Sequence, residues 1–115
     1  MQLELLRDGD GLTARPIGEL DHHAAGEVRE KIDTALLLQN IRTLRIDLSG
    51  LTFMDSSGIG LIMGRYRLMK AMGGAMQVAG ASERMDKVMR LAGLEKLGIL
   101  QAQSAERKES TNEAK

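Results

Sequence analysis

The sequence predicts one α/β domain: a small mixed sheet with helices packed on it. Segments with the two-residue alternation of strands take turns with segments that carry apolar residues at three- and four-residue steps. A short turn joins the first two strands, which implies an antiparallel pair, whereas the later strand–helix–strand units imply parallel neighbours. A chain of 115 residues is long enough for one compact domain and too short for two ordinary ones.

The chain begins with a predicted β-hairpin. Leu3 and Leu5 alternate with polar residues in the first strand, and Asp and Gly at positions 8–11 form the turn. The second strand is expected at residues 12–17. Pro16 lies inside it and has no N–H for the ladder, which predicts an edge position or a bulge.

The first helix is expected to begin at Asp21, whose side chain can accept from the free N–H groups of the first turn. Asn40 is the expected terminator, and residues 44–48 alternate as the next strand. The spacing of apolar residues predicts the buried face of this helix: Ala25, Val28, Ile32, Ala35 and Leu36.

The second helix is expected to begin near Ser57 and to end at Gly73-Gly74, where glycine suits the left-handed conformation of a C-terminal cap. Gly60 and Gly64 leave one flank of this helix bare. Internal packing against the sheet and contact with a partner are both open explanations. The predicted core face consists of Ile59, Ile62, Met63, Tyr66 and Met69.

The last elements follow the same patterns. Residues 75–79 are expected to form a strand, and Ser82 caps a helix that ends at Gly93. Residues 97–100 are a possible final strand. The domain is predicted to span residues 1–106, with 107–115 as a disordered polar tail. The expected inner face of this helix is Met85, Val88, Met89 and Ala92.

Composition excludes several classes of function. Sixteen basic and sixteen acidic residues give a net charge of zero, which removes the electrostatic argument for nucleic acid or an anionic membrane. The lack of cysteine excludes a disulfide framework and fits a cytoplasmic location. No apolar run approaches the roughly 20 residues that a membrane span needs. The eight methionines are interpreted as core filler rather than as an adaptable contact surface.

The segment Phe53-Met54-Asp55-Ser56-Ser57-Gly58-Ile59-Gly60 is the candidate functional site. A catalytic Ser56 is disfavoured because the Gly-x-Ser-x-Gly elbow is absent. A metal at His22-His23 is disfavoured because successive helical side chains diverge by about 100° and no other His or Cys could complete the site. A phosphate-binding loop is disfavoured because no Walker lysine follows the glycines. We therefore expect no catalytic residues, no metal and no cofactor.

Two roles remain for the hydroxyl of Ser56. One is structural, because Asp55, Ser56 or Ser57 can cap the helix, and composition alone favours this role. The other is phosphorylation. A helix N-terminus offers unpaired N–H groups and a positive dipole, so a phosphate there gains hydrogen bonds without unfolding the domain.

Three blocks of the sequence resemble the anti-sigma factor antagonists of the STAS family: residues 18–23 (Gly-Glu-Leu-Asp-His-His), residues 53–58 (Phe-Met-Asp-Ser-Ser-Gly) and Gly64-Arg65-Tyr66. The Leu-Asp-His-His part of the first block is similar to the sporulation branch, which acts in the sigma-F pathway. The resemblance extends to about residue 100 and implies a STAS fold with four or five strands. Pro16 departs from the pattern, because relatives carry a strand residue there.

The resemblance implies a binding protein without catalytic activity. The unphosphorylated form would bind an anti-sigma factor serine kinase and release a sporulation sigma factor. The kinase would phosphorylate Ser56, and a serine phosphatase would reverse the mark. A STAS domain of another pathway, or one that binds nucleotide, is the alternative. The residues implied to contact the partner are Asp21, His22, His23, Asp55, Ser56, Ser57, Gly58, Gly60 and Met63.

Overall fold

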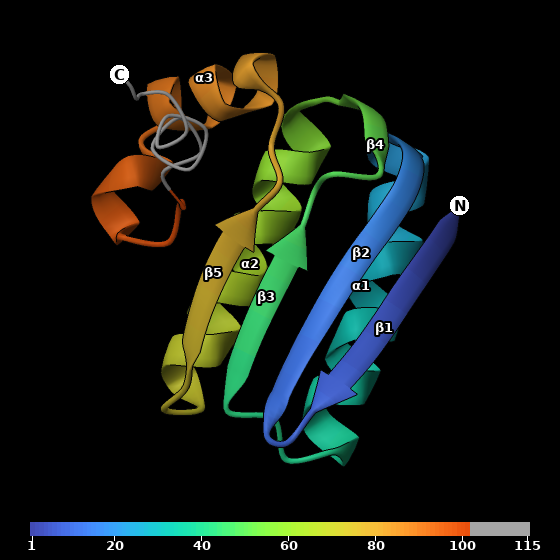
Figure 1. Cartoon of the computed structure of the whole chain (residues 1–115), viewed down its shortest axis with the longest axis vertical. Helices are drawn as coiled ribbons and strands as arrows, with labels where there is room; N and C mark the ends of the chain where they lie inside the picture. Colours follow the sequence, from blue (N-terminus) through green and yellow to red (C-terminus); the bar gives the residue numbers. More distant parts are fainter. Residues whose placement is uncertain (102–115) are drawn as a thin grey trace, which may run out of the picture.

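The computed structural model describes residues 1–101, which form one mixed sheet with helices on one side of it (Figure 1). The strand order is β1-β2-β3-β5, and β4 pairs with β2 beyond the end of its pairing with β3. In chain order the elements are β1 (Gln2–Asp8), β2 (Gly11–Leu20), α1 (His22–Leu38), β3 (Thr43–Asp47), β4 (Leu51–Met54), α2 (Ser56–Ala71), β5 (Ala75–Ala79), α3 (Glu83–Leu91) and the 3-10 helix η1 (Leu94–Leu97).

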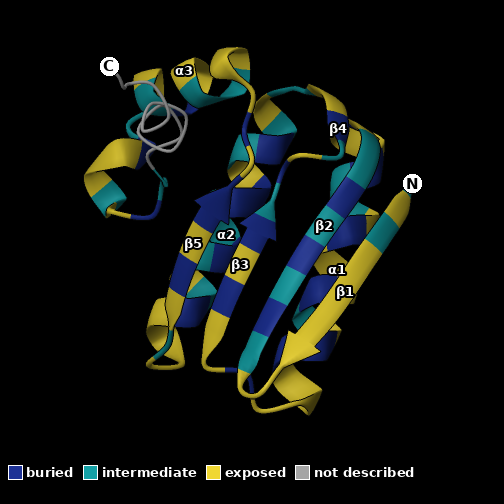
Figure 2. Cartoon of the chain, viewed as in Figure 1, coloured by how far each residue is buried: buried dark blue, intermediate teal, exposed yellow. Residues whose placement is uncertain are grey.

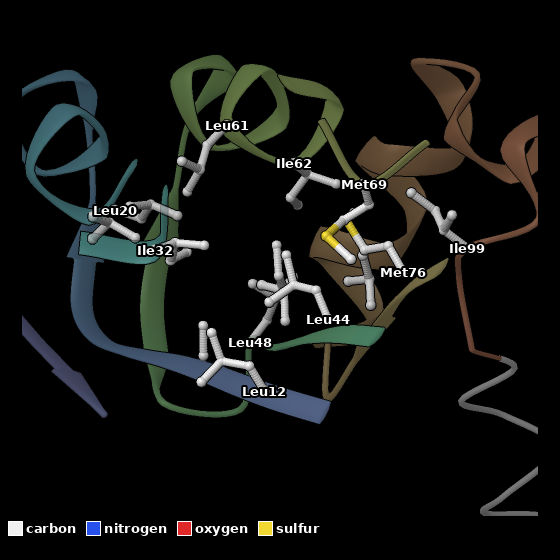
Figure 3. Packing of buried hydrophobic residues seen from close by; sticks show 14 of the residues in the cluster. Leu12, Leu20, Ile32, Leu44, Leu48, Leu61, Ile62, Met69, Met76 and Ile99 are labelled. Carbon is white, nitrogen blue, oxygen red and sulfur yellow. The ribbon is translucent and has the colours of Figure 1, made fainter. Parts of the chain in front are cut away.

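The core lies between the sheet and the layer formed by α1 and α2, while the opposite face of the sheet is uncovered (Figures 1 and 2). Strand alternation sends Leu12, Leu44 and Met76 into this layer, where Figure 3 shows them on the side of Ile62 and Met69. The predicted α/β class is therefore confirmed. The interpretation of methionine as core filler is confirmed for seven of the eight methionines, and Met72 is the exception because it is 39% exposed. The seven that are buried or partly buried are Met1, Met54, Met63, Met69, Met76, Met85 and Met89.

The predicted hairpin is present, but the edge position predicted from Pro16 is wrong. The strand β2 is central: it pairs with β1 on one side and with β3 and then β4 on the other. Its pairing with β3 ends at Ala14, and its pairing with β4 begins at Gly18. Pro16 lies in the gap between the two partners, where no ladder hydrogen bond is needed on that side. The register irregularity falls two residues later, between Gly18 and Glu19.

The sequence patterns did not predict β4. Its four residues follow a tight turn in which the N–H of Leu51 donates to the carbonyl of Leu48 at 3.0 Å. Only Leu51 is buried, and Phe53 is 47% exposed, so the strand lacks an alternating pattern. The pairing with β2, and not a periodic pattern in its own sequence, therefore holds this segment in the extended conformation.

The helices begin and end close to the predicted residues. In α1 the predicted buried face is confirmed except at its first position, where Ala24 is buried and Ala25 is only partly buried. Asn40 has a φ of 56°, as its predicted terminating role requires. In α2, Ile59, Met63 and Tyr66 are partly buried, because the helix is turned by about one residue from the prediction. Its buried face consists of Gly58, Leu61, Ile62, Arg65 and Met69.

The region after β5 differs most from the prediction. Of the expected inner face of α3 only Met89 is buried; Met85 is partly buried, Val88 is 42% exposed and Ala92 is exposed. The predicted strand at 97–100 is wrong. That segment contains the end of η1 and a single bridge between Leu100 and Val78. The predicted boundary at residue 106 and the tail at 107–115 lie outside the described residues. Within residues 1–101 no helix is long and apolar enough to cross a membrane.

Glycines of α2 and its C-terminal turn give a first prediction about stability. A Cβ on Gly74 would lie 2.5 Å from the carbonyl oxygen of Arg42 and 2.7 Å from Cε of Met69, whereas one on Gly64 would have no neighbour within 4 Å. We expect Gly74→Ala to destabilise the fold by about 1–3 kcal/mol, because the backbone at Arg42 or at residue 74 must move to make room for the added methyl group. The matched Gly64→Ala should stabilise it by about 0.5–1 kcal/mol through helix propensity. Urea unfolding of both variants checks this, and equal effects would contradict it.

Candidate functional site

Parallel pairing of β2 with β4 brings the two predicted loops together. Leu20 and Met54 are partners in the register, so the residues that follow them, Asp21 and Asp55, start their helices at the same end of the sheet. The N–H of Asp55 also donates to the carbonyl of Leu20 at 3.4 Å. Both helices therefore begin at the upper end of the molecule in Figure 1, and blocks 34 residues apart in sequence form one surface.

The two helices are capped by equivalent aspartates. Oδ1 of Asp21 accepts from the N–H of Ala24 at 2.9 Å, and Oδ1 of Asp55 accepts from the N–H of Ser57 at 2.8 Å. The cap of α1 at Asp21 is confirmed. For α2, the cap is Asp55, so neither serine hydroxyl has that role. The structural explanation for a serine at position 56 is thereby removed.

Ser56 is the first residue of α2 and its side chain is exposed. It lies where the free N–H groups and the positive end of the helix dipole are found. A phosphoryl group on its oxygen would project into solvent next to Asp55 in the chain, at the sheet end where Asp21 also lies. The geometry therefore permits phosphorylation without displacement of any core residue.

Ser57 has a different environment, which the sequence did not indicate. Its Oγ lies 3.4 Å from Nδ1 of His22, the first residue of α1. This contact links the two helix N-termini. It also brings a hydroxyl near an imidazole, but within residues 1–101 no carboxylate is hydrogen-bonded to that imidazole, and Asp21 is bonded to the backbone of its own helix. The contact therefore joins the N-terminus of α2 to that of α1.

The two histidines diverge as predicted for adjacent helical residues. His22 lines the groove between α1 and α2, whereas His23 lines a separate hollow with Asp21 and Glu27. Among the described residues no group of three or more His, Cys, Asp or Glu side chains is placed to hold a metal ion.

Three further predicted residues lie on α2 in different environments. Gly60 is exposed and Met63 is partly buried against the core. Gly58 is buried: a Cβ there would collide with Met54 and lie 3.2 Å from Cδ2 of Leu20. A residue with a side chain therefore does not fit at position 58 unless Met54 moves.

A groove of about 510 Å³ runs from this loop between α1 and α2. Sequence reasoning did not place Gly26, Arg29 or Arg65 in the site, although all three line the groove. The side chain of Arg65 is 9% exposed, and its Nε lies 2.8 Å from Oδ1 of Asp33. The two atoms form an ion pair that lacks hydrogen-bond alignment, so within the described chain neither has a hydrogen-bond partner. The sequence did contain a signal for Arg65, because it lies three and four residues from Ile62 and Leu61 and so shares a helix face with apolar residues.

Comparison with known proteins places the chain among bacterial regulators. The model of the STAS domain matches residues 2–107. An anti-sigma F factor antagonist of Lysinibacillus sphaericus is 41% identical over 93 residues, which cover 81% of this chain and 79% of that protein.

Two solved structures of SpoIIAA are similar to the fold. The unphosphorylated anti-sigma factor antagonist SpoIIAA has a TM-score of 0.77 and 34% identity, with 87% of this chain and 86% of that chain covered. The phosphorylated form of SpoIIAA, a Bacillus cell fate determinant, has a TM-score of 0.72 and 35% identity, with 87% and 89% covered.

The Asp21 cap predicts a pH dependence. The hydrogen bond from the N–H of Ala24 lowers the pKa of the Asp21 carboxyl below its ordinary value. The folded pKa is thus below the unfolded one, so this carboxylate stabilises the fold at neutral pH and its contribution is lost as pH falls through the folded pKa. Asp21→Asn keeps a capping side chain that does not titrate.

We therefore expect the wild type to lose stability relative to Asp21→Asn as the pH falls below about 4. Urea unfolding across a pH series measures the difference. Parallel stability curves for the two proteins would show that the capping bond does not favour the charged form.

Proposed function

The chain belongs to the STAS domain family, and from this premise we propose that it is an anti-anti-sigma factor controlled by phosphorylation of Ser56. In its unphosphorylated form it binds an anti-sigma factor that is also a serine kinase, and so releases a sporulation sigma factor. The kinase transfers phosphate from ATP to Ser56, which ends the interaction. A metal-dependent serine phosphatase restores the binding form. The protein itself has no catalytic role in this cycle.

The exposure of Ser56 carries this proposal. Its two neighbours in the Asp55-Ser56-Ser57 segment both have structural roles, because Asp55 caps α2 and Ser57 contacts His22. An exposed hydroxyl at the first residue of a helix is accessible to a kinase and later to a phosphatase. The names of the relatives support the regulatory role, and a phosphorylated form of SpoIIAA supports the modification.

Electrostatics explain why the modification would end binding. A phosphoserine adds a charge of about −1.5 to −2 beside two carboxylates, those of Asp21 and Asp55. The helix N-terminus stabilises this charge, so the fold of the modified chain is retained. A partner that fits the unmodified surface then meets a bulky anion. The block is direct and needs no rearrangement of the core.

The proposed contact surface follows from the positions of the residues. Asp21, His22 and His23 lie at the start of α1, and Ser56 and Ser57 lie beside them at the start of α2. Gly60 and Met63 extend the surface along α2.

The nucleotide-binding alternative has less support. Gly58, Ile59 and Gly60 lie within α2, and Gly58 is packed against Met54 and Leu20, so these glycines do not form a phosphate-binding loop. Nothing in the described residues favours a different regulatory pathway.

Ser56→Ala tests the site of modification. We expect this variant to bind the anti-sigma factor kinase with an affinity close to that of the wild type, because alanine removes the hydroxyl without adding charge. Incubation with the kinase and ATP should add no phosphoryl group, as measured by intact-mass spectrometry. Ser57→Ala is the matched control and should still gain one phosphoryl group at Ser56. Phosphorylation of Ser56→Ala, or its failure to bind, would contradict the proposal.

Ser56→Asp tests the electrostatic mechanism. The added carboxylate should weaken binding of the kinase by about tenfold or more, because it places a third anion on the docking surface. Ser56→Asn has nearly the same shape and no charge, so it should bind more tightly than Ser56→Asp. Titration calorimetry of both variants measures the difference. Equal affinities would assign the block to shape rather than to charge.

A further inference from the structure

We propose that the groove between α1 and α2 holds an acidic helical segment of the anti-sigma factor, an inference that rests on the proposed function. The groove begins at His22 and Ser57, beside the phosphoacceptor. It continues away from the loop for about two helical turns, to Arg29 on α1 and Arg65 on α2. A partner bound at Ser56 can therefore extend into it without leaving the proposed surface.

The floor of the groove is formed by glycines that have no internal function. A Cβ added to Gly26, Gly60 or Gly64 would have no neighbour within 4 Å. Internal packing, one of the two explanations for Gly60 and Gly64, is therefore wrong. Each glycine in a helix costs about 1 kcal/mol relative to alanine. Gly60 and Gly64 stand four residues apart on one face, the spacing that lets a second helix approach closely.

The walls of the groove are cationic. Two arginines line it, and no Asp or Glu lines it in the described part of the chain. The side chain of Arg65 is more than nine-tenths buried, and its Nε lies 2.8 Å from Oδ1 of Asp33 in an ion pair without hydrogen-bond alignment, whereas Arg29 is exposed. Burial lowers the pKa of Arg65, the charge of Asp33 raises it, and repulsion by Arg29 lowers it further. A carboxylate placed between the two arginines would offset both the burial and the repulsion.

Backbone hydrogen bonding favours a helix as the occupant. The sides of the groove are helix interiors, whose N–H and C=O groups are bonded within α1 and α2. An extended segment would find no backbone partners there and would leave its own unpaired, whereas a helix pairs its backbone internally. A nucleotide is disfavoured because no aromatic side chain lines the described groove for stacking. A second copy that docked groove to groove about a two-fold axis is disfavoured because it would bring the arginines of the two grooves together.

An acidic helix in the groove also explains why phosphorylation would weaken binding rather than strengthen it. A phosphate on Ser56 would lie at the mouth of the groove, where it repels an acidic helix. The same charge that leaves the fold intact would therefore act on the partner through like-charge repulsion.

Charge reversal in the groove tests the inference. Binding of the purified anti-sigma factor kinase to the full chain is measured by titration calorimetry at two salt concentrations. Arg29→Glu alters an exposed side chain, so the fold is retained, and we expect about tenfold weaker binding with a smaller salt dependence. Arg42→Glu is the matched control: it makes the same change of charge at an exposed residue after the C-terminal end of α1, and should stay within about twofold of the wild type.

Filling the groove is the second test. Gly64→Leu adds bulk two turns from Ser56 at a position with free space, and should weaken binding by about tenfold or more. If Arg29→Glu and Gly64→Leu both bind the kinase with wild-type affinity, the proposal that the groove binds an acidic helix is wrong. The proposed function would be unaffected by that result. Equal weakening by Arg42→Glu would also overturn the proposal for the groove, since net charge would then explain the effect. A wild-type chain that does not bind the kinase would overturn the proposed function as well.

Discussion

The parallel pairing of β2 with β4 is the constraint on which the functional surface depends. It fixes Leu20 beside Met54, and each strand is followed at once by an aspartate that caps a helix. Because both caps lie at the same sheet end, the two helix N-termini share one surface. The contact between Ser57 and His22, the position of Ser56 and the mouth of the α1–α2 groove all follow from this register. A shift of one residue in this pairing would turn the side chains of one strand to the other face of the sheet and would move the two helix N-termini relative to each other.

That pairing exists only because β2 has two partners on the same side. Pro16 occupies the gap between them, and its carbonyl faces Gly50, where a Cβ would lie 2.9 Å from that oxygen. The N–H of Gly18 then donates to the carbonyl of Gly50 at 3.0 Å, just before β4 begins. Proline and glycine thus act together: one needs no ladder hydrogen bond, and the other lets the β3–β4 turn approach closely. This explains how a central strand accommodates a residue that normally belongs at an edge.

The sequence predicted the elements with strong local signals and missed those fixed by tertiary contacts. Asp21, Ser82 and Asn40 have the predicted roles because caps and left-handed terminators depend on neighbouring backbone. In contrast, β4 lacks alternation, and α2 has apolar residues on most sides, so its buried face could not be found from spacing. That face includes Gly58 and Arg65, which hydropathy would place outside. The cationic groove was likewise invisible, because its residues come from two helices whose relative rotation no local pattern encodes.

The different roles of three successive residues explain how this surface can carry a signal without loss of stability. Asp55 provides the cap, so the stability of α2 does not require either hydroxyl. Ser57 links α2 to His22, which holds the two loops in a fixed relation. Ser56 is left exposed at the helix N-terminus, where the proposed phosphate would be favourable for the fold and would repel an acidic partner. If serine itself capped α2, phosphorylation would compete with helix formation, and the switch would act through unfolding. With aspartate as the cap, the proposed phosphorylation would change the surface charge and leave the core unchanged.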